Sequence, residues 1–198
     1  MRKIFGHRGL PRIYKENTFT GINKAYEHCD FVEIDVRLTG DNQLILHHDP
    51  NIGDDLIKNL SLSELDILMK DGSIHDSILV SRDQIHGGVN FEIKTDTLDD
   101  SEVDILFQKM LSIFEPGDIV SSFNWKAIQS FKNLFNCNYG IIFDKEEDLF
   151  EAQAPRGRPA RASPLRPQAE SPAHSWTLPQ SNAMSSSPLQ VRPWMRRL

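Results

Sequence analysis

The 198-residue sequence divides into two segments of opposite charge. Residues 1–151 contain 15 Lys and Arg against 27 Asp and Glu, a formal charge of −12, whereas residues 152–198 carry +6. The acidic first segment argues against a nucleic-acid surface, because nucleic-acid phosphates are bound by clustered Lys and Arg. The sequence also has no run of 18 apolar residues, so no transmembrane segment is expected.

The start of the chain and its two cysteines predict a cytoplasmic protein. A strand-like segment follows Met1 almost directly, which leaves no room for a signal peptide. Cys29 and Cys137 are far apart and lack metal-ligand spacing, so both are expected to be reduced thiols. The oligomeric state is left open by the sequence.

The first predicted elements are a strand, a turn and a helix. Residues 3–8 form a short strand, and a glycine on each side of His7 and Arg8 lets both side chains project from the strand end toward a ligand. A helix follows, with Asn17 or Thr18 as its cap.

The next predicted elements are two strands that end in polar groups. In residues 31–38, Glu33 and Asp35 interrupt a β-branched strand at a spacing of two, which places both carboxylates on one face. Residues 40–42 make a turn, and residues 43–48 form the second strand.

Helices and strands alternate through the rest of the first segment. Ser61 and Glu64 form a capping box at the start of a helix over residues 61–69. Further strands are expected at 89–94, 118–123 and 139–143, and further helices at 102–114 and 124–135. Six strands separated mostly by helices predict a parallel sheet with right-handed crossovers.

The positions of the polar residues favour a TIM-type (β/α)8 barrel over a doubly wound sheet. Polar side chains end four successive strands: His7, Glu33, Asp35, His48, Glu92 and Lys94. A barrel gathers such groups around one mouth, and no Gly-rich nucleotide loop follows the first strand. We therefore predict an α/β fold of the TIM-barrel type.

Three of these residues suit a divalent cation. Glu33, Asp35 and Glu92 offer hard oxygen ligands on neighbouring strands, the set that holds Mg²⁺ or Ca²⁺. Carboxylates buried among Val and Ile are costly unless their charge is compensated. A cation is the simplest compensation.

The basic residues suit proton transfer and anion binding. His7 and His48 titrate near neutral pH, so one can accept a proton while the other donates. Arg8 and Lys94 lie beside the expected cation site and call for an anionic ligand, for which a phosphate group is suitable.

Residues 152–198 differ in composition from the preceding barrel-like segment, residues 1–151. They hold 8 of the 11 prolines and are rich in Ser, Ala and Arg. Such a low-complexity tail buries too little apolar surface to offset its ordering entropy, so disorder is expected. The abrupt exchange of Lys for Arg suggests a shifted reading frame or a fusion.

Six short motifs, taken in order, resemble the glycerophosphodiester phosphodiesterase family. They are Gly6-His7-Arg8-Gly9, Glu16-Asn17-Thr18, Glu33-x-Asp35, His48-Asp49, Asn90-x-Glu92-x-Lys94 and Ser122-Phe123-Asn124. The resemblance covers about residues 3–145. It implies a barrel that ends after about six strands, without the C-terminal quarter of the family domain.

The resemblance also implies an activity and roles for individual residues. The activity is metal-dependent hydrolysis of glycerophosphodiesters to glycerol 3-phosphate and an alcohol such as choline or ethanolamine, a step of lipid and glycerol metabolism. The metal ligands are Glu33, Asp35 and Glu92; the acid–base pair is His7 and His48; Arg8 and Lys94 lie near the phosphate; Glu16, Asn17, Asp49 and Asn90 support the site.

Two alternatives stay open. One is that the chain is an inactive fragment that keeps the metal- and phosphate-binding half. The other is a related phospholipase D-type barrel acting on lysophospholipids. Both stand beside the phosphodiesterase activity that the resemblance implies. Which histidine is the base also stays open.

Overall fold

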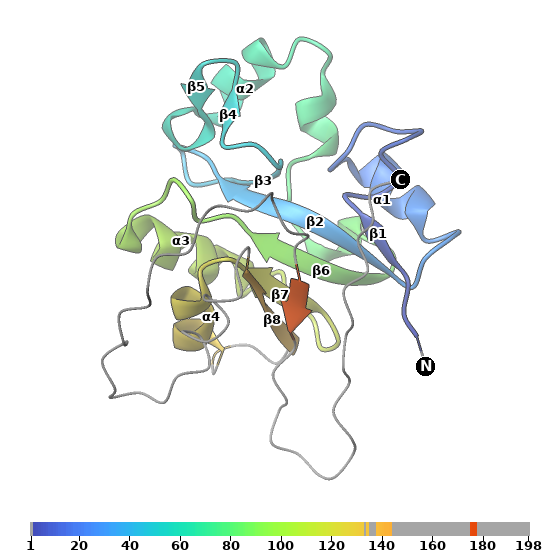
Figure 1. The fold of residues 1–198 in the computed structure, drawn as a ribbon. Helices are drawn as coiled ribbons and strands as arrows, with labels where there is room; N and C mark the ends of the chain where they lie inside the picture. Colours follow the sequence, from blue (N-terminus) through green and yellow to red (C-terminus); the bar gives the residue numbers. More distant parts are fainter. Residues whose placement is uncertain (1, 133, 135–137, 144–174, 178–198) are drawn as a thin grey trace, which may run out of the picture.

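The computed structural model describes residues 2–132, 134, 138–143 and 175–177, and its centre is a curved sheet (Figure 1). The parallel strands follow the order β1 (Phe5–His7), β2 (Phe31–Leu38), β6 (Gly88–Ile93), β7 (Ile119–Ser122) and β8 (Asn138–Phe143). Two antiparallel strands extend this sheet, β3 (Leu44–Leu46) on β2 and β9 (Ser175–Thr177) on β8. A separate two-stranded ribbon consists of β4 (Asn51–Ile52) and β5 (Asp55–Leu56).

Helical segments connect the strands of the described chain. The α-helices are α1 (Phe19–Ala25), α2 (Leu62–Leu68), α3 (Asp100–Met110) and α4 (Trp125–Phe131). Short 3-10 segments are η1 (Ile57–Asn59), η2 (Ser73–Asp76) and η3 (Arg82–Gln84). None of the helices among the described residues has the length and apolarity needed to cross a bilayer.

Capping side chains determine where these helices begin. Thr18 accepts a hydrogen bond of 3.3 Å from a backbone N–H of α1. Ser61 and Glu64 form the predicted capping box of α2. Asp99 caps α3, which therefore begins at Asp100, two residues before the predicted start.

Side-chain alternation in β2 and β6 gives the sheet one apolar and one polar face. The apolar side chains pack with α1, α3 and α4 in the main core and are at most 1% exposed: Val32, Ile34, Val36, Val89, Phe91 and Ile93. Burial of each one stabilises the fold by about 1.5–3 kcal/mol. A one-residue slip would expose them all, so the strand register is strongly fixed.

The register places the predicted site residues of neighbouring strands side by side. His7 pairs with Glu33, Glu33 with Asn90, and Asp35 with Glu92. All five lie on the same face of the sheet, opposite the apolar side chains of β2 and β6. Packing on one face of the sheet therefore positions the functional groups on the other.

One predicted strand runs in the opposite direction to our expectation. Residues 43–48 contain β3, which pairs antiparallel with β2 through Val36 and Leu46 and through Leu38 and Leu44. The connection is too short for a parallel crossover, which needs a dozen or more residues. The described chain therefore has five parallel strands rather than six.

The tail prediction concerns residues that lie mostly outside the described part of the chain. Among residues 152–198 the structure describes only β9, which pairs with β8. The proposed boundary after residue 151 and the proposed reading-frame shift therefore stay predictions.

Candidate active site

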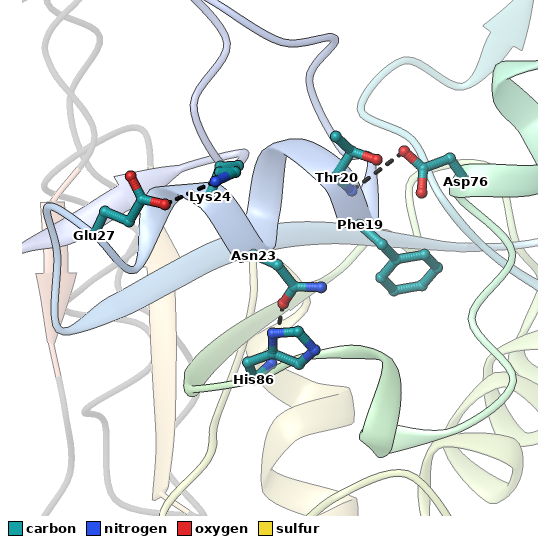
Figure 2. Close-up of a pocket in the computed structure, with 7 residues that line it drawn as sticks. All are labelled: Phe19, Thr20, Asn23, Lys24, Glu27, Asp76 and His86. Carbon is teal, nitrogen blue, oxygen red and sulfur yellow. Dashed lines mark hydrogen bonds and ion pairs between the residues drawn. The ribbon is translucent and has the colours of Figure 1, made fainter.

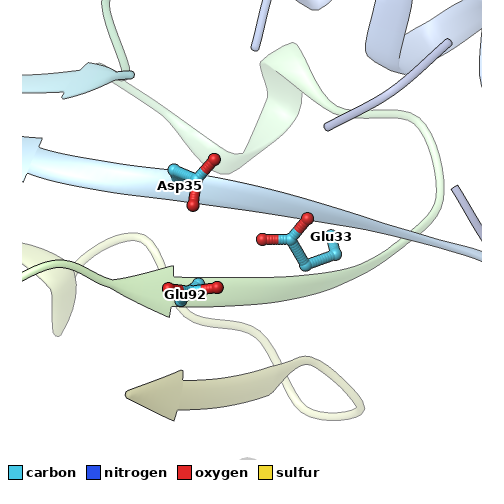
Figure 3. A group of neighbouring side chains, drawn as sticks. All are labelled: Glu33, Asp35 and Glu92. Carbon is cyan, nitrogen blue, oxygen red and sulfur yellow. The ribbon is translucent and has the colours of Figure 1, made fainter. Parts of the chain in front are cut away.

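Three carboxylates converge on the polar face of the sheet (Figure 3). Glu33 and Asp35 project from β2, and Glu92 projects from β6 beside them. They are 2%, 1% and 6% exposed, and one oxygen of each lies within 4.8 Å of the others. The three predicted metal ligands are thus brought together.

Burial and mutual repulsion shift the titration of these carboxylates. Burial, followed by the charges of Asp35 and Glu92, raises the pKa of Glu33 well above its usual range. Burial also raises the pKa of Glu92, although Lys94 opposes it. For Asp35, burial acts upward, but Lys94 and the Asn17 amide outweigh it, so its pKa falls.

Two cations face the three carboxylates. The Lys94 Nζ atom lies 2.9 Å from Asp35 Oδ1 and also contacts Glu92 Oε1. Burial acts to lower the pKa of Lys94, but the charges of Asp35 and Glu92 outweigh it and the pKa rises. Arg8 Nε lies 3.3 Å from Asp35 Oδ2, and Arg8 Nη1 donates to both oxygens of Glu16, at 3.3 and 3.2 Å.

The site has an excess of negative charge and of acceptor atoms. Within the described residues, Glu33 Oε1 and Asp35 Oδ1 are buried and accept no hydrogen bond of good geometry, and Asp35 Oδ1 has the Lys94 ammonium 2.9 Å away as an ion-pair partner. Unsatisfied buried oxygens are costly. The three carboxylates fit a hard divalent cation, which would satisfy these oxygens and balance the charge.

The loop between β1 and α1 has a strained backbone, and it supports Asp35. Asn17 donates to Asp35 Oδ2 at 2.8 Å and accepts from the Asp35 backbone N–H at 3.1 Å. Asn17 and Arg8 both have left-handed φ values, 56° and 55°. A Cβ atom on Gly9 would lie 2.9 Å from the Ile22 nitrogen, so only glycine fits there. Strain of this kind gathers at functional sites.

The two predicted acid–base residues lie near the carboxylates. His7 Nε2 is 3.8 Å from Glu33 Oε2, and burial followed by the Arg8 charge lowers the His7 pKa. His48 Nδ1 is 2.7 Å from Asp49 Oδ1. Because a carboxylate only accepts, Nδ1 carries the hydrogen and Nε2 remains available for chemistry. The charge of His48 also acts on the pKa values of His7 and Glu92.

Asn90 and Ser121 form a polar pair beside Glu33, and the sequence analysis missed Ser121. Asn90 is 3% exposed, and its Oδ1 accepts a 2.9 Å hydrogen bond from Ser121 Oγ on β7. Ser121 lies in register with Glu92. A serine in a short apolar strand gave no signal of its own.

Arg37 is the second residue that sequence reasoning missed. It is 4% exposed and donates to the backbone carbonyl of His48 and to the carboxylate of Asp96. It continues the two-residue spacing of Glu33 and Asp35 along β2, and this alternation is the signal that would have found it.

A surface cavity of about 550 Å³ lies elsewhere, between α1, η2 and the start of β6 (Figure 2). Its lining residues are Phe19, Thr20, Asn23, Lys24, Glu27, Asp76 and His86. Its polar groups bond to one another, as in the 2.9 Å contact of Lys24 with Glu27 and the 3.0 Å bond from the His86 backbone N–H to Asn23. It shares no residue with the carboxylate site.

The fold and the site together define a class of protein. A curved sheet of parallel strands flanked by helices, with three buried carboxylates and His7 on its polar face, is a TIM-type barrel arrangement. The model of the glycerophosphoryl diester phosphodiesterase family matches residues 7–152. The chain therefore belongs to this family of phosphoric diester hydrolases, which confirms the resemblance of its motifs.

Individual relatives agree with the family match. The chain is 37% identical over 71 residues to a glycerophosphodiester phosphodiesterase of Bacillus altitudinis, covering 33% of this chain and 29% of that protein. The solved glycerophosphodiester phosphodiesterase of Thermotoga maritima is 28% identical with a TM-score of 0.55, covering 76% of this chain and 69% of that one. The predicted α/β fold of TIM type is thereby confirmed.

A second solved structure shares the fold alone. It is an Oleispira antarctica phosphodiesterase in complex with the product sn-glycerol-3-phosphate, 24% identical with a TM-score of 0.56, covering 71% of this chain and 66% of that one. The chain spans less than two thirds of the length of the curated relatives that it matches.

Proposed function

We propose that this site hydrolyses glycerophosphodiesters to glycerol 3-phosphate and an alcohol, using Mg²⁺ or Ca²⁺ held by Glu33, Asp35 and Glu92. The observation that carries the proposal is the buried carboxylate group with two unsatisfied oxygens, placed beside two cations and two histidines. The product found in the Oleispira antarctica structure supports glycerol 3-phosphate as the product here.

Each group at the site has a proposed role. The bound cation would supply positive charge that stabilises the extra negative charge on the phosphoryl oxygens. Arg8 and Lys94 bind the phosphate, Arg8 through its planar guanidinium and Lys94 as a point charge. Glu16 and Asn17 hold Arg8 and Asp35 in place, through the ion pair and the amide contacts described above.

The two histidines move the protons. One takes the proton of the attacking oxygen, and the other gives a proton to the departing alkoxide as its bond to phosphorus breaks. Attack by water gives glycerol 3-phosphate directly, whereas attack by the neighbouring glycerol hydroxyl gives a cyclic phosphate that water then opens to glycerol 3-phosphate. Asp49 accepts from His48 Nδ1 and so fixes which ring nitrogen faces the substrate. Asn90, held by Ser121, lines the sheet beside Glu33.

Release of glycerol 3-phosphate from glycerophosphocholine tests the proposal. We expect turnover with Mg²⁺ or Ca²⁺, none with excess chelator, and losses of about 100-fold or more in His7→Ala and His48→Ala, the range of general acid–base catalysis. His75→Ala is the matched control, because it removes another His–Asp pair, 3.0 Å from Asp66, outside the site.

A substrate with a nitrophenolate leaving group assigns the two histidines. This leaving group needs no proton, so the variant that lacks the general acid keeps its activity on that substrate and the variant that lacks the base does not. A folded chain without any turnover would contradict the proposal and favour the inactive fragment. Faster cleavage of a lysophospholipid than of its deacylated counterpart would favour the phospholipase D-type activity.

We also propose a cytoplasmic location, supported by the free thiol of Cys29. Cell fractionation checks it. Limited proteolysis checks the proposed boundary after residue 151. If residues 1–132 are cleaved before the tail, the boundary is contradicted.

A further inference from the structure

Arg37 is a buried cation that the proposed chemistry does not use directly. It lies on β2 two residues after Asp35, on the polar face of the strand, and its side chain is 5% exposed. Burying a guanidinium is costly unless its donors are satisfied. The contacts of its guanidinium therefore identify the segments that Arg37 holds in place.

The Arg37 guanidinium joins two segments that are far apart in the sequence. Its Nε and Nη2 atoms donate to the backbone carbonyl of His48 at 3.0 and 2.6 Å. Its Nη1 and Nη2 atoms donate to the two carboxylate oxygens of Asp96 at 2.7 and 3.3 Å. Asp96 follows Lys94 by two residues, so the contact ties β2 to the turn at His48 and to the segment after β6.

Other contacts hold the same turn at neighbouring points. The His47 backbone N–H donates to the Asp35 carbonyl at 3.0 Å, and His47 Nδ1 is 3.0 Å from the Asp49 carbonyl. Within the described residues, the His48 carbonyl accepts its hydrogen bonds from Arg37 alone. Arg37 thus holds the backbone from which the His48 ring projects.

We propose that Arg37, oriented by Asp96, is a positioning residue that fixes the His48 turn relative to the carboxylates. The inference rests on the proposed function for its catalytic consequence. Lysine cannot replace arginine here, because one ammonium lacks the planar fork that bonds a carboxylate and a carbonyl at once. A displacement of about 1 Å in a catalytic group costs up to about 100-fold in rate.

Arg82 provides a matched control. It donates to Asp118 through Nε and Nη2 at 2.9 and 2.8 Å, and to the carbonyls of Ile85 and Gly87 at 2.7 and 2.6 Å. It is therefore another arginine, with its side chain 11% exposed, that bonds one aspartate and backbone carbonyls, and no residue of the proposed site is among its partners.

The experiment compares Arg37→Lys, Asp96→Asn and Arg82→Lys in the full chain, measuring kcat, KM, divalent-cation affinity and the melting temperature. We expect kcat to fall about 10- to 100-fold in Arg37→Lys and less in Asp96→Asn, with KM and cation affinity within about threefold of wild type. Arg82→Lys should lower the melting temperature and keep kcat. Wild-type kcat in Arg37→Lys, or equal loss in Arg82→Lys, would overturn the inference.

Nuclear magnetic resonance of the imidazoles separates this inference from the proposed function. In Arg37→Lys we expect the His48 ring signals to shift or broaden while those of His75 keep their wild-type positions. This readout holds even if the wild-type chain has no turnover, which would contradict the proposed function alone. Unchanged His48 signals would overturn the positioning role.

Discussion

Two groups of charges lie at different places on the parallel strands, and they are built differently. Arg82 and Asp118 precede β6 and β7, and Arg82 bonds both oxygens of Asp118 and two backbone carbonyls, with all four distances between 2.6 and 2.9 Å. On the polar face of β2 and β6, three carboxylates face two cations, and buried oxygens of Glu33 and Asp35 accept no hydrogen bond within the described chain.

The difference separates a structural role from a binding role. Arg82 and Asp118 satisfy each other, so removing either partner leaves an unpaired buried charge, which costs about 3–5 kcal/mol. Burial, followed by the charges of the neighbouring carboxylates, raises the pKa of Glu33, so the ionised group opposes folding until a cation binds. Buried charge that is costly to the fold is expected at a binding site.

The largest expected effect contrasts Glu33→Gln with Asp118→Asn. Glu33→Gln should reduce turnover more than about 100-fold, because even second-shell partners of a metal cost 10- to 100-fold. It should also leave the metal-free chain at least as stable, since it removes a repelled carboxylate. Asp118→Asn should do the reverse, losing about 3–5 kcal/mol of stability and keeping kcat.

Chemical unfolding and steady-state kinetics on the same preparations check this contrast. Wild-type turnover in Glu33→Gln would remove Glu33 from the site. Destabilisation of Glu33→Gln as large as that of Asp118→Asn would show that the two charge groups do not differ. Ser61→Ala, which removes only the cap of α2, serves as a control for small losses of about 1 kcal/mol.

The second prediction concerns pH and the divalent cation. Glu33 and Glu92 have raised pKa values, so the folded metal-free chain keeps protons that the unfolded chain releases. Its stability should therefore fall as pH rises above about 4.3. Asp35 has a lowered pKa, so it contributes stability that is present above about 3.9 and is lost as pH falls below that value.

A saturating divalent cation should weaken this dependence on pH. At 100 times its Kd it should add about 2.7 kcal/mol, and it should flatten the decline between pH 5 and 8 because ionised carboxylates bind it. Thermal unfolding in chelator and in Mg²⁺ or Ca²⁺ measures both effects. Identical curves in the two conditions would show that the carboxylates bind neither ion.

The sequence predicted the polar face of the sheet because a strand has a strict two-residue period. Glu33 and Asp35 alternate with fully buried Val32, Ile34 and Val36, and the same alternation places Glu92 on β6. The capping box at Ser61 was equally local. Such features depend on residues that are close together in the sequence, so the local pattern is enough to predict them.

Features that depend on distant residues were not predictable in the same way. The direction of β3 was decided by a short turn that prevents a crossover, although its composition resembles that of a parallel strand. Arg37 and Asp96 are 59 residues apart, and nothing in either local pattern pairs them. The sequence therefore predicted the carboxylates and histidines of the site. The alternation along β2 also places Arg37 on the polar face, but its contacts with Asp96 and with the His48 turn were not predictable.

The smallest expected effect is that of Asp49→Asn, and it refines the comparison at the carboxylate site. The His48–Asp49 pair is 2.7 Å long, but the Asp49 side chain is 71% exposed, so water and salt weaken it. The His48 hydrogen bond lowers the pKa of Asp49, so the charged pair is lost as pH falls through that lowered value. We expect kcat to fall about tenfold at low salt and less at high salt, within the range of a positioned second-shell partner.

Asp66→Asn is the control, because Asp66 pairs with His75 in another exposed contact, of 3.0 Å, outside the site. Steady-state kinetics at about 0.05 and 0.5 M salt check the difference, because those concentrations bracket the Debye screening of an exposed pair. Unchanged kcat in Asp49→Asn, together with a large loss in Arg37→Lys, would mean that His48 is oriented through its backbone. The buried cation would then govern the site, and the exposed carboxylate would be dispensable.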